Sequence, residues 1–156
     1  MIYDLPFSEY STQSSFLLGK WIEDARSLGT DEASKNYYEE NARTLAQRRA
    51  LLEKRFADFA ALVLESGRAS FALCQNVYCA TDVRHQGLSV ALALSQSILQ
   101  GSSGAWRMQG GGFAGTIQAY VPETLLQRYH TAMERVFGPG SCYVLRLREQ
   151  GARQVL

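Results

Sequence analysis

The chain has 156 residues, of which 46% are hydrophobic and 20% are charged, the composition of an ordinary globular protein with one core. Sixteen basic and fifteen acidic residues leave a net charge of +1, which argues against a polybasic nucleic-acid surface or an anionic-membrane anchor. The three cysteines form no close pair, and no stretch is long and apolar enough to suggest a membrane helix. We therefore expect a cytoplasmic protein with no nucleic-acid or membrane partner.

The first part of the sequence has helical periodicity. Residues 11–28 carry apolar side chains at steps of three and four, which predicts an amphipathic helix. A longer apolar stripe follows over residues 38–63, with Arg49 as its only break. Such a stripe fits a coiled coil or a buried seam between helices. Because no other segment supplies a matching heptad pattern, we expect one long intramolecular helix, bent near Lys54 and Arg55.

Two more helices are predicted before the pattern changes. Gly67 is expected to end the long helix, and residues 70–81 are expected to form the next one. Gly87 then separates that helix from the apolar stretch 88–99, which Gly101 closes.

After Gly101 the apolar residues alternate with a period of two. Residues 105–109 and 116–121 therefore predict two short strands. In the second strand Ile117, Ala119 and Val121 share one face, while Thr116, Gln118 and Tyr120 share the other.

A last helix is predicted from Pro122 to the glycine-proline-glycine run at residues 138–140. Its buried stripe is expected to be Leu125, Leu126, Tyr129, Met133 and Val136. Residues 141–148 predict a third strand, and residues 152–156 allow a short fourth. The elements indicate an α+β fold in which a helical layer packs on one face of a small, mostly antiparallel sheet. We expect one domain over residues 1–156, in which residues 1–35 form a helical segment whose placement the sequence does not define.

The most distinctive segment is Gly110-Gly111-Gly112-Phe113-Ala114-Gly115. It satisfies the dinucleotide-binding fingerprint literally, but that fingerprint requires a helix directly afterwards, and residues 116–121 alternate like a strand. Two interpretations remain: a wide hairpin turn with bulges, or backbone that a phosphate or a facing segment approaches closely. Four glycines in six residues carry a high entropic cost, which favours the second. The neighbouring Arg107 is a candidate contact for the anion.

Several segments together resemble one family. The glycine-rich run and residues 104–109 before it are similar to the third motif of the GHMP small-molecule kinases, in its galactokinase version. Residues 40–43 (Glu-Asn-Ala-Arg), the Glu65-Ser66-Gly67 segment and residues 142–146 resemble further parts of the same family. The resemblance extends over residues 36–156 and implies the fold of a GHMP kinase C-terminal domain. The sequence departs from the pattern at Gly67, Trp106, Gln109 and Ala114.

The resemblance implies the C-terminal domain of a galactokinase-like enzyme that transfers the γ-phosphate of ATP to a sugar hydroxyl. ATP, Mg²⁺ and the catalytic base would then belong to a site completed by an N-terminal kinase half, so this chain alone is expected to be inactive. The loop residues implied to support the phosphate site are Gly110, Gly111, Gly112, Phe113 and Gly115. Phe113 fits equally well as hydrophobic filler.

No catalytic residue and no metal ligand set is expected within the chain, whose two histidines, His85 and His130, are far apart. The expected partners are the N-terminal kinase half, a small-molecule sugar and a second copy that forms a homodimer through the exposed interface. The alternative function is a non-catalytic sugar-binding or regulatory module on the same fold.

Overall fold

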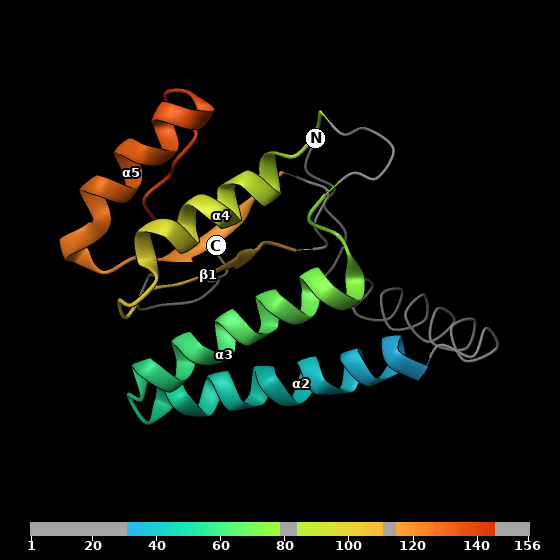
Figure 1. Cartoon of the computed structure of the whole chain (residues 1–156). Helices are drawn as coiled ribbons and strands as arrows, with labels where there is room; N and C mark the ends of the chain where they lie inside the picture. Colours follow the sequence, from blue (N-terminus) through green and yellow to red (C-terminus); the bar gives the residue numbers. More distant parts are fainter. Residues whose placement is uncertain (1–30, 79–83, 111–114, 146–156) are drawn as a thin grey trace, which may run out of the picture.

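The computed structural model describes residues 31–78, 84–110 and 115–145, with side chains from residue 38 onward. In chain order the elements are α2 (Asp31–Leu52), α3 (Phe56–Ala69), the π-helical turn η1 (Ser70–Cys74), α4 (Gly87–Leu99), β1 (Ala105–Met108), β2 (Ile117–Tyr120) and α5 (Glu123–Phe137). The predicted α+β class is confirmed, since helices surround a two-stranded antiparallel sheet in this part of the chain (Figure 1). The helix expected over residues 11–28 and the strand expected over 152–156 lie outside the described residues.

Helices pack on both faces of the sheet, with α3 on one side and α4 and α5 on the other (Figure 1). Ala105 of β1 packs against Ala60 and Val63 of α3. The next residue, Trp106, points the opposite way and joins the cluster around Leu99 of α4. The prediction that helices pack on only one face is therefore wrong. Ala105 and Tyr120 make one face of the sheet apolar in part, and Trp106, Met108 and Ile117 make the other face apolar, so both faces need cover.

The register of the sheet agrees with the predicted alternation. Ala105 lies opposite Tyr120, and Met108 lies opposite Ile117. Ile117, Ala119 and Val121 all pack into the cluster formed by α4 and α5, so the face predicted for them is confirmed. Tyr120 points to the other face, where its ring meets Phe59 of α3 edge-on with ring centroids 5.0 Å apart.

Residues 38–63 form two helices rather than one long bent helix, so that prediction is wrong. Helix α2 ends at Leu52, a three-residue turn follows, and α3 begins at Phe56 and runs back beside α2 (Figure 1). Lys54 has a left-handed backbone (φ 57°) in the turn, and the Arg55 N–H donates to the Ala50 carbonyl at 2.8 Å. The turn contains no glycine or proline, so the local sequence does not predict that the chain reverses here.

Gly67 lies inside α3 and does not end the helix, contrary to the prediction. A Cβ at this position would lie 3.1 Å from the Cβ of Arg107 and 3.3 Å from the carbonyl oxygen of Trp106. The missing side chain therefore lets α3 approach the backbone of β1 closely. The separate helix predicted over residues 70–81 is not found either, because the helical run continues directly into η1 and ends at Gln75, which has a left-handed backbone (φ 49°). Residues 76–78 are not helical, and 79–81 lie outside the described residues.

Helices α4 and α5 agree with their predicted ranges. Tyr129 and Met133 form the buried centre of α5, but Val136 is exposed, so its place in the predicted buried stripe is wrong. The third strand expected over residues 141–148 is not found in its described part, because residues 141–145 belong to no strand, while 146–148 lie outside the described residues. Cys142 packs against the α4 and α5 cluster, and Tyr143 and Leu145 are exposed. A strand requires a neighbour for its N–H and C=O groups, which alternation alone does not reveal.

Candidate functional site

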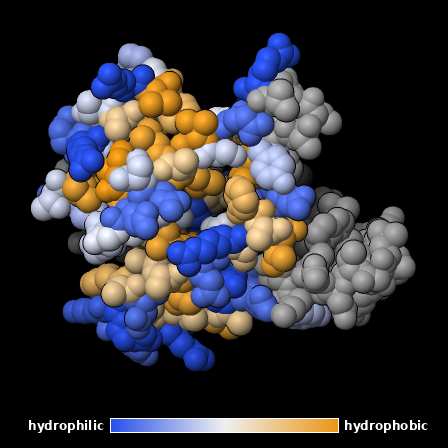
Figure 2. All heavy atoms as spheres, in the orientation of Figure 1, coloured by the Kyte–Doolittle hydropathy of each residue, from blue (hydrophilic) through white to orange (hydrophobic). Residues whose placement is uncertain are grey.

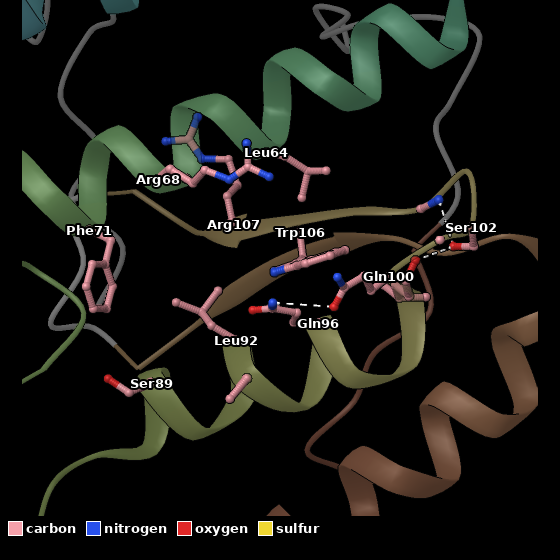
Figure 3. Close-up of a pocket in the computed structure, with 15 residues that line it drawn as sticks. Leu64, Arg68, Phe71, Ser89, Leu92, Gln96, Gln100, Ser102, Trp106 and Arg107 are labelled. Atoms are coloured by element: carbon pink, nitrogen blue, oxygen red, sulfur yellow. Dashed lines mark hydrogen bonds between the residues drawn. The ribbon is translucent and has the colours of Figure 1, made fainter.

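A groove of about 420 Å³ lies between α3 and α4 (Figure 3). Its walls come from α3, η1, α4, the turn that enters β1, and β1 itself. The groove has the size of a small-molecule site and combines aromatic, aliphatic, amide and guanidinium groups. At this groove α3, which packs on one face of the sheet, and α4, which packs on the other, both lie beside β1.

Trp106 is the central side chain of the groove. It points from β1 toward α4, where Leu92, Gln96 and Gln100 face it (Figure 3). Packing against the buried Leu99 cluster fixes the indole on one side and leaves it half-buried. The ring is therefore a rigid apolar surface with one partly accessible side.

Gln96 and Gln100 supply amide groups beside this ring. They are four residues apart on α4 and the turn after it, so they share one face of the helix. The Gln96 Nε2 lies 3.5 Å from the Gln100 Oε1, at the long limit of a hydrogen bond. Both side chains are exposed, and most of their hydrogen-bonding capacity is free for a ligand.

The turn from α4 into β1 closes one end of the groove. The Ser102 hydroxyl donates to the Leu99 carbonyl at 2.6 Å and accepts from the Gly104 N–H at 3.0 Å. A Cβ at Gly104 would lie 3.0 Å from the Tyr120 carbonyl oxygen, so the turn can pack tightly on β2 only with glycine there. The Ser102 hydroxyl therefore stabilises the turn through these two hydrogen bonds and is not free for a ligand.

Arg107 points away from Trp106, toward α3 and α2. Its Nη1 donates to the Ser66 hydroxyl at 2.6 Å and lies 3.3 Å from a Glu40 carboxylate oxygen, while its Nε donates to the Met108 carbonyl at 3.1 Å. The cation at Arg107 thus already has an internal carboxylate partner. The anion contact that the sequence predicts for Arg107 is not tested by these contacts and stays a prediction.

Glu40 is the centre of a polar network that joins α2, α3 and β1. It accepts hydrogen bonds from Ser66 and Arg43 in addition to Arg107. Burial opposes ionisation of this carboxyl, but the hydrogen bonds from Ser66 and Arg43, with the charges of Arg43 and Arg107, outweigh it and lower the pKa of Glu40 below its usual range. Glu40 is therefore held as an anion.

Arg43 is the buried cation of the same network. Its Nη2 donates to the Glu65 carboxylate at 3.1 Å, but its buried Nε has no hydrogen-bond partner. Burial favours the neutral form, yet the hydrogen bonds to Glu65 and Glu40 prevail and raise the pKa of Arg43. Arg43 thus depends on these two carboxylates to compensate its charge.

Arg68 differs from the other two arginines. It lies on α3, is exposed and lines the groove (Figure 3). Within the described residues no carboxylate lies at ion-pair distance from it. Its guanidinium donors are therefore available at the rim of the groove.

The glycine-rich loop connects β1 to β2. Gly110 and Gly115 have left-handed backbones (φ 62° and 79°), and Gln109 N–H donates to the Thr116 carbonyl at 3.0 Å to extend the hairpin. Gly111, Gly112 and Phe113, which the resemblance assigned to a phosphate site, lie outside the described residues. Neither Gly110 nor Gly115 lines the groove, and the phosphate role of the loop stays a prediction.

Sequence reasoning did not single out Trp106, Gln96 or Gln100 as site residues. Trp106 stood out only as a departure from a motif, and the two glutamines were visible only as an i, i+4 pair in an apolar helix. Across the described ranges no three histidine, cysteine or acidic side chains gather as a metal site would require. In the same ranges no helix is both long and apolar enough to cross a bilayer.

Residues 10–48 match the model of the alpha-N-acetylglucosaminidase (NAGLU) C-terminal domain. The matched range ends within α2 and includes Glu40 and Arg43 of the polar network. No curated protein and no solved structure gives a significant match.

This match contradicts the resemblance to the galactokinase-like GHMP kinases, and the sugar-kinase function and ATP-binding kinase domain inferred from it are wrong. The resemblance depended on short segments, above all a glycine-rich run, and such runs serve many hairpin connections because glycine adopts a left-handed backbone easily. Residues 10–48 are similar to a glycosidase C-terminal domain, and not to a kinase domain. The expectations of Mg²⁺ and of a partner half depended on the same resemblance, and no described contact tests them.

Proposed function

We propose that this chain is a glycosidase-associated domain that binds a saccharide in the groove between α3 and α4, without cleaving it. The observation that carries this proposal is the placement of the Trp106 ring opposite the Gln96 and Gln100 amides (Figure 3). The match to the alpha-N-acetylglucosaminidase C-terminal domain supports the glycosidase association.

A sugar ring fits this combination of groups. One side of a pyranose presents C–H groups, which pack on an aromatic ring, while its hydroxyls require hydrogen-bond partners at the edges. Trp106 supplies the ring, and Leu92 extends the apolar floor. Gln96, Gln100 and Arg68 supply donors and acceptors around it.

The groove lacks the groups that hydrolysis requires. Glycoside cleavage normally uses two carboxyl groups on either side of the scissile bond. The described lining of the groove contains no aspartate, glutamate, histidine or cysteine. We therefore assign binding, and not catalysis, to the groove.

N-acetylglucosamine is the first ligand to test, because the matched family is named for an alpha-N-acetylglucosaminidase. Calorimetric titration of the full chain with N-acetylglucosamine and its short oligomers should show binding. Gln96→Ala and Gln100→Ala should each weaken it by about 3- to 10-fold, the value of one hydrogen bond. Trp106→Ala should abolish it.

Two matched controls separate the groove from general effects. Gln127→Ala removes an exposed glutamine from α5, and Tyr143→Ala removes an exposed aromatic residue, both outside the groove. Both variants should bind as tightly as the original chain. Failure of the original chain to bind any of these saccharides, or an equal loss in Gln96→Ala and Gln127→Ala, would contradict the proposal.

A further inference from the structure

Helix α2 carries its large apolar side chains on the outside of the molecule. Tyr38, Leu45 and Leu52 are 59%, 60% and 66% exposed, respectively, and each is seven residues from the next. Figure 2 shows apolar atoms among the charged ones along the lower edge of the molecule, over α2 and α3. The three residues form a continuous stripe, because seven residues are close to two helical turns.

The opposite side of α2 faces α3, and it buries a charged residue and a small one instead of large apolar side chains. Its buried residues are Arg43, which belongs to the Glu40 network, and Ala50. On a helix of 3.6 residues per turn, Arg43 and Ala50 lie far around the axis from Leu45. A helix at the surface of a monomer normally buries its leucines and exposes its arginines. Helix α2 is therefore arranged for a second apolar partner on its outer side.

We infer that the outer stripe of α2, defined as Tyr38, Ala42, Leu45, Arg49 and Leu52, is where a second copy of this chain docks. The stripe has the alternating spacing of four and three residues that is typical of a two-stranded coiled coil. A second copy presents the same stripe, so the two stripes can pack against each other about a two-fold axis. Such an interface uses the same surface on both copies and stops at a dimer.

The charges beside the stripe select a parallel arrangement. Arg48 flanks it on one side and has no ion-pair partner among the described residues. Glu53 flanks the end of the stripe on the other side; it is the first residue after α2, and its N–H still donates to the Arg49 carbonyl at 3.0 Å. In a parallel pair, Arg48 of one copy faces Glu53 of the other, five residues further along. One antiparallel register would bring the two Arg48 side chains together, and the other would place Arg48 beside Asn41 of the second copy, so neither gives Arg48 a carboxylate partner. Glu53 accepts from Arg55 at 2.8 Å, and its exposed carboxylate has room for a second donor.

The dimer should be weak and reversible. The stripe from Tyr38 to Leu52 is about 21 Å long at 1.5 Å per residue, which places the interface at the small end of specific interfaces. Arg49 lies within the stripe, and a charged residue at such a position lowers the stability of a coiled coil. Removal of that charge should therefore strengthen the association.

Sedimentation velocity of the full chain over a micromolar to millimolar series tests this directly. The original chain should show a monomer–dimer equilibrium. Leu45→Lys should raise the dissociation constant at least about 10-fold, and Arg49→Leu should lower it about 10-fold. Val90→Lys, which changes an exposed apolar residue on α4, is the matched control and should leave the constant unchanged.

A charge exchange tests the direction of the helices. Arg48→Glu should weaken the dimer, and addition of Glu53→Lys in the same chain should restore it, since the exchanged charges meet again only in a parallel pair. A chain that stays monomeric throughout the series would overturn the inference. So would assembly beyond a dimer, an Arg49→Leu variant with no gain in affinity, or equal effects of Leu45→Lys and Val90→Lys. Lack of restoration in the double variant would overturn the parallel arrangement.

Discussion

At the scale of single residues, Glu40 connects three elements. It lies on α2, and its carboxylate accepts from Ser66 on α3 and from Arg107 on β1, as well as from its neighbour Arg43. Such hydrogen bonds to an ionised group are stronger than neutral ones. The carboxylate therefore fixes Arg107 at the edge of the groove and compensates the buried Arg43.

Replacement of Glu40 by glutamine should lower the free energy of unfolding by about 1–3 kcal/mol near neutral pH, because the buried Arg43 loses a charged partner. The pKa of Glu40 is lowered in the folded state, so its stabilising contribution is complete above the usual value of 4.5 and is lost as the pH falls through the folded pKa. Urea unfolding from about pH 7 to about pH 3 should show a flatter acid dependence for Glu40→Gln.

Glu65→Gln is the control for this variant, because Glu65 is the other, more exposed partner of Arg43. It should cost less stability than Glu40→Gln. An unchanged acid dependence in Glu40→Gln would show that the network does not determine the acid stability of the protein.

Gly67→Ala should destabilise the protein by about 1 kcal/mol, although alanine normally favours a helix. The new methyl group would contact the Arg107 Cβ and the Trp106 carbonyl oxygen, which belong to the backbone region of β1 and cannot move independently. Gly87→Ala at the start of α4 meets nothing within 4 Å and should be neutral or stabilising. Thermal unfolding of the two variants in parallel gives the comparison, and equal shifts would contradict the close approach.

At the scale of elements, the α2–α3 hairpin is the feature that local sequence did not show. The apolar spacing continues from Tyr38 to Val63 through a turn that contains only charged residues. The two helices bury different stripes, Arg43 and Ala50 on α2 and Ala60 and Val63 on α3. Reversal of the chain, and not continued periodicity, brings these stripes together.

Lys54 should tolerate glycine with a gain in stability. Its backbone is left-handed (φ 57°), a conformation that costs a non-glycine residue about 1 kcal/mol and costs glycine nothing. Lys54→Gly should therefore raise the free energy of unfolding by about 0.5–1 kcal/mol. Lys54→Ala retains the Cβ and should give no gain, so denaturant unfolding of the two variants isolates the backbone effect. A lower stability of Lys54→Gly relative to Lys54→Ala would refute the explanation.

At the scale of the whole molecule, β1 joins two apolar clusters. Ala105 belongs to the cluster with α3, while Trp106 belongs to the cluster with α4 and α5. Each cluster lies on its own face of a sheet that has two strands in the described part. Because β1 contributes side chains to both clusters, we expect the clusters on the two faces of the sheet to unfold together.

Leu99→Ala should lower the free energy of unfolding by about 2–5 kcal/mol, because Leu99 is fully buried. Native-state hydrogen exchange should then show lost protection in α3 as well as in α4, since both helices depend on β1. Leu145→Ala removes an exposed leucine and should change stability by less than about 0.5 kcal/mol. Protection lost in α4 and α5 alone would show two independently unfolding sides.

The sequence by itself determined the α+β class, the ranges of α4 and α5, and the face shared by Ile117, Ala119 and Val121. These features follow from periodicity, which is a local property of the chain and is visible without a structure. The unpaired segment 141–145 shows the limit of such reasoning, because alternation predicts a strand but does not supply a neighbour.

Only the tertiary structure decided which residues meet. Arg107 reaches Glu40, 67 positions earlier in the chain, and the Tyr120 ring meets Phe59 on a helix that lies far before it in the sequence. Contacts at such separation depend on how helices pack on the sheet, and no local pattern encodes them. The outward leucines of α2 belong to the same class: the stripe was visible in the sequence, but only the position of α3 shows that it is exposed.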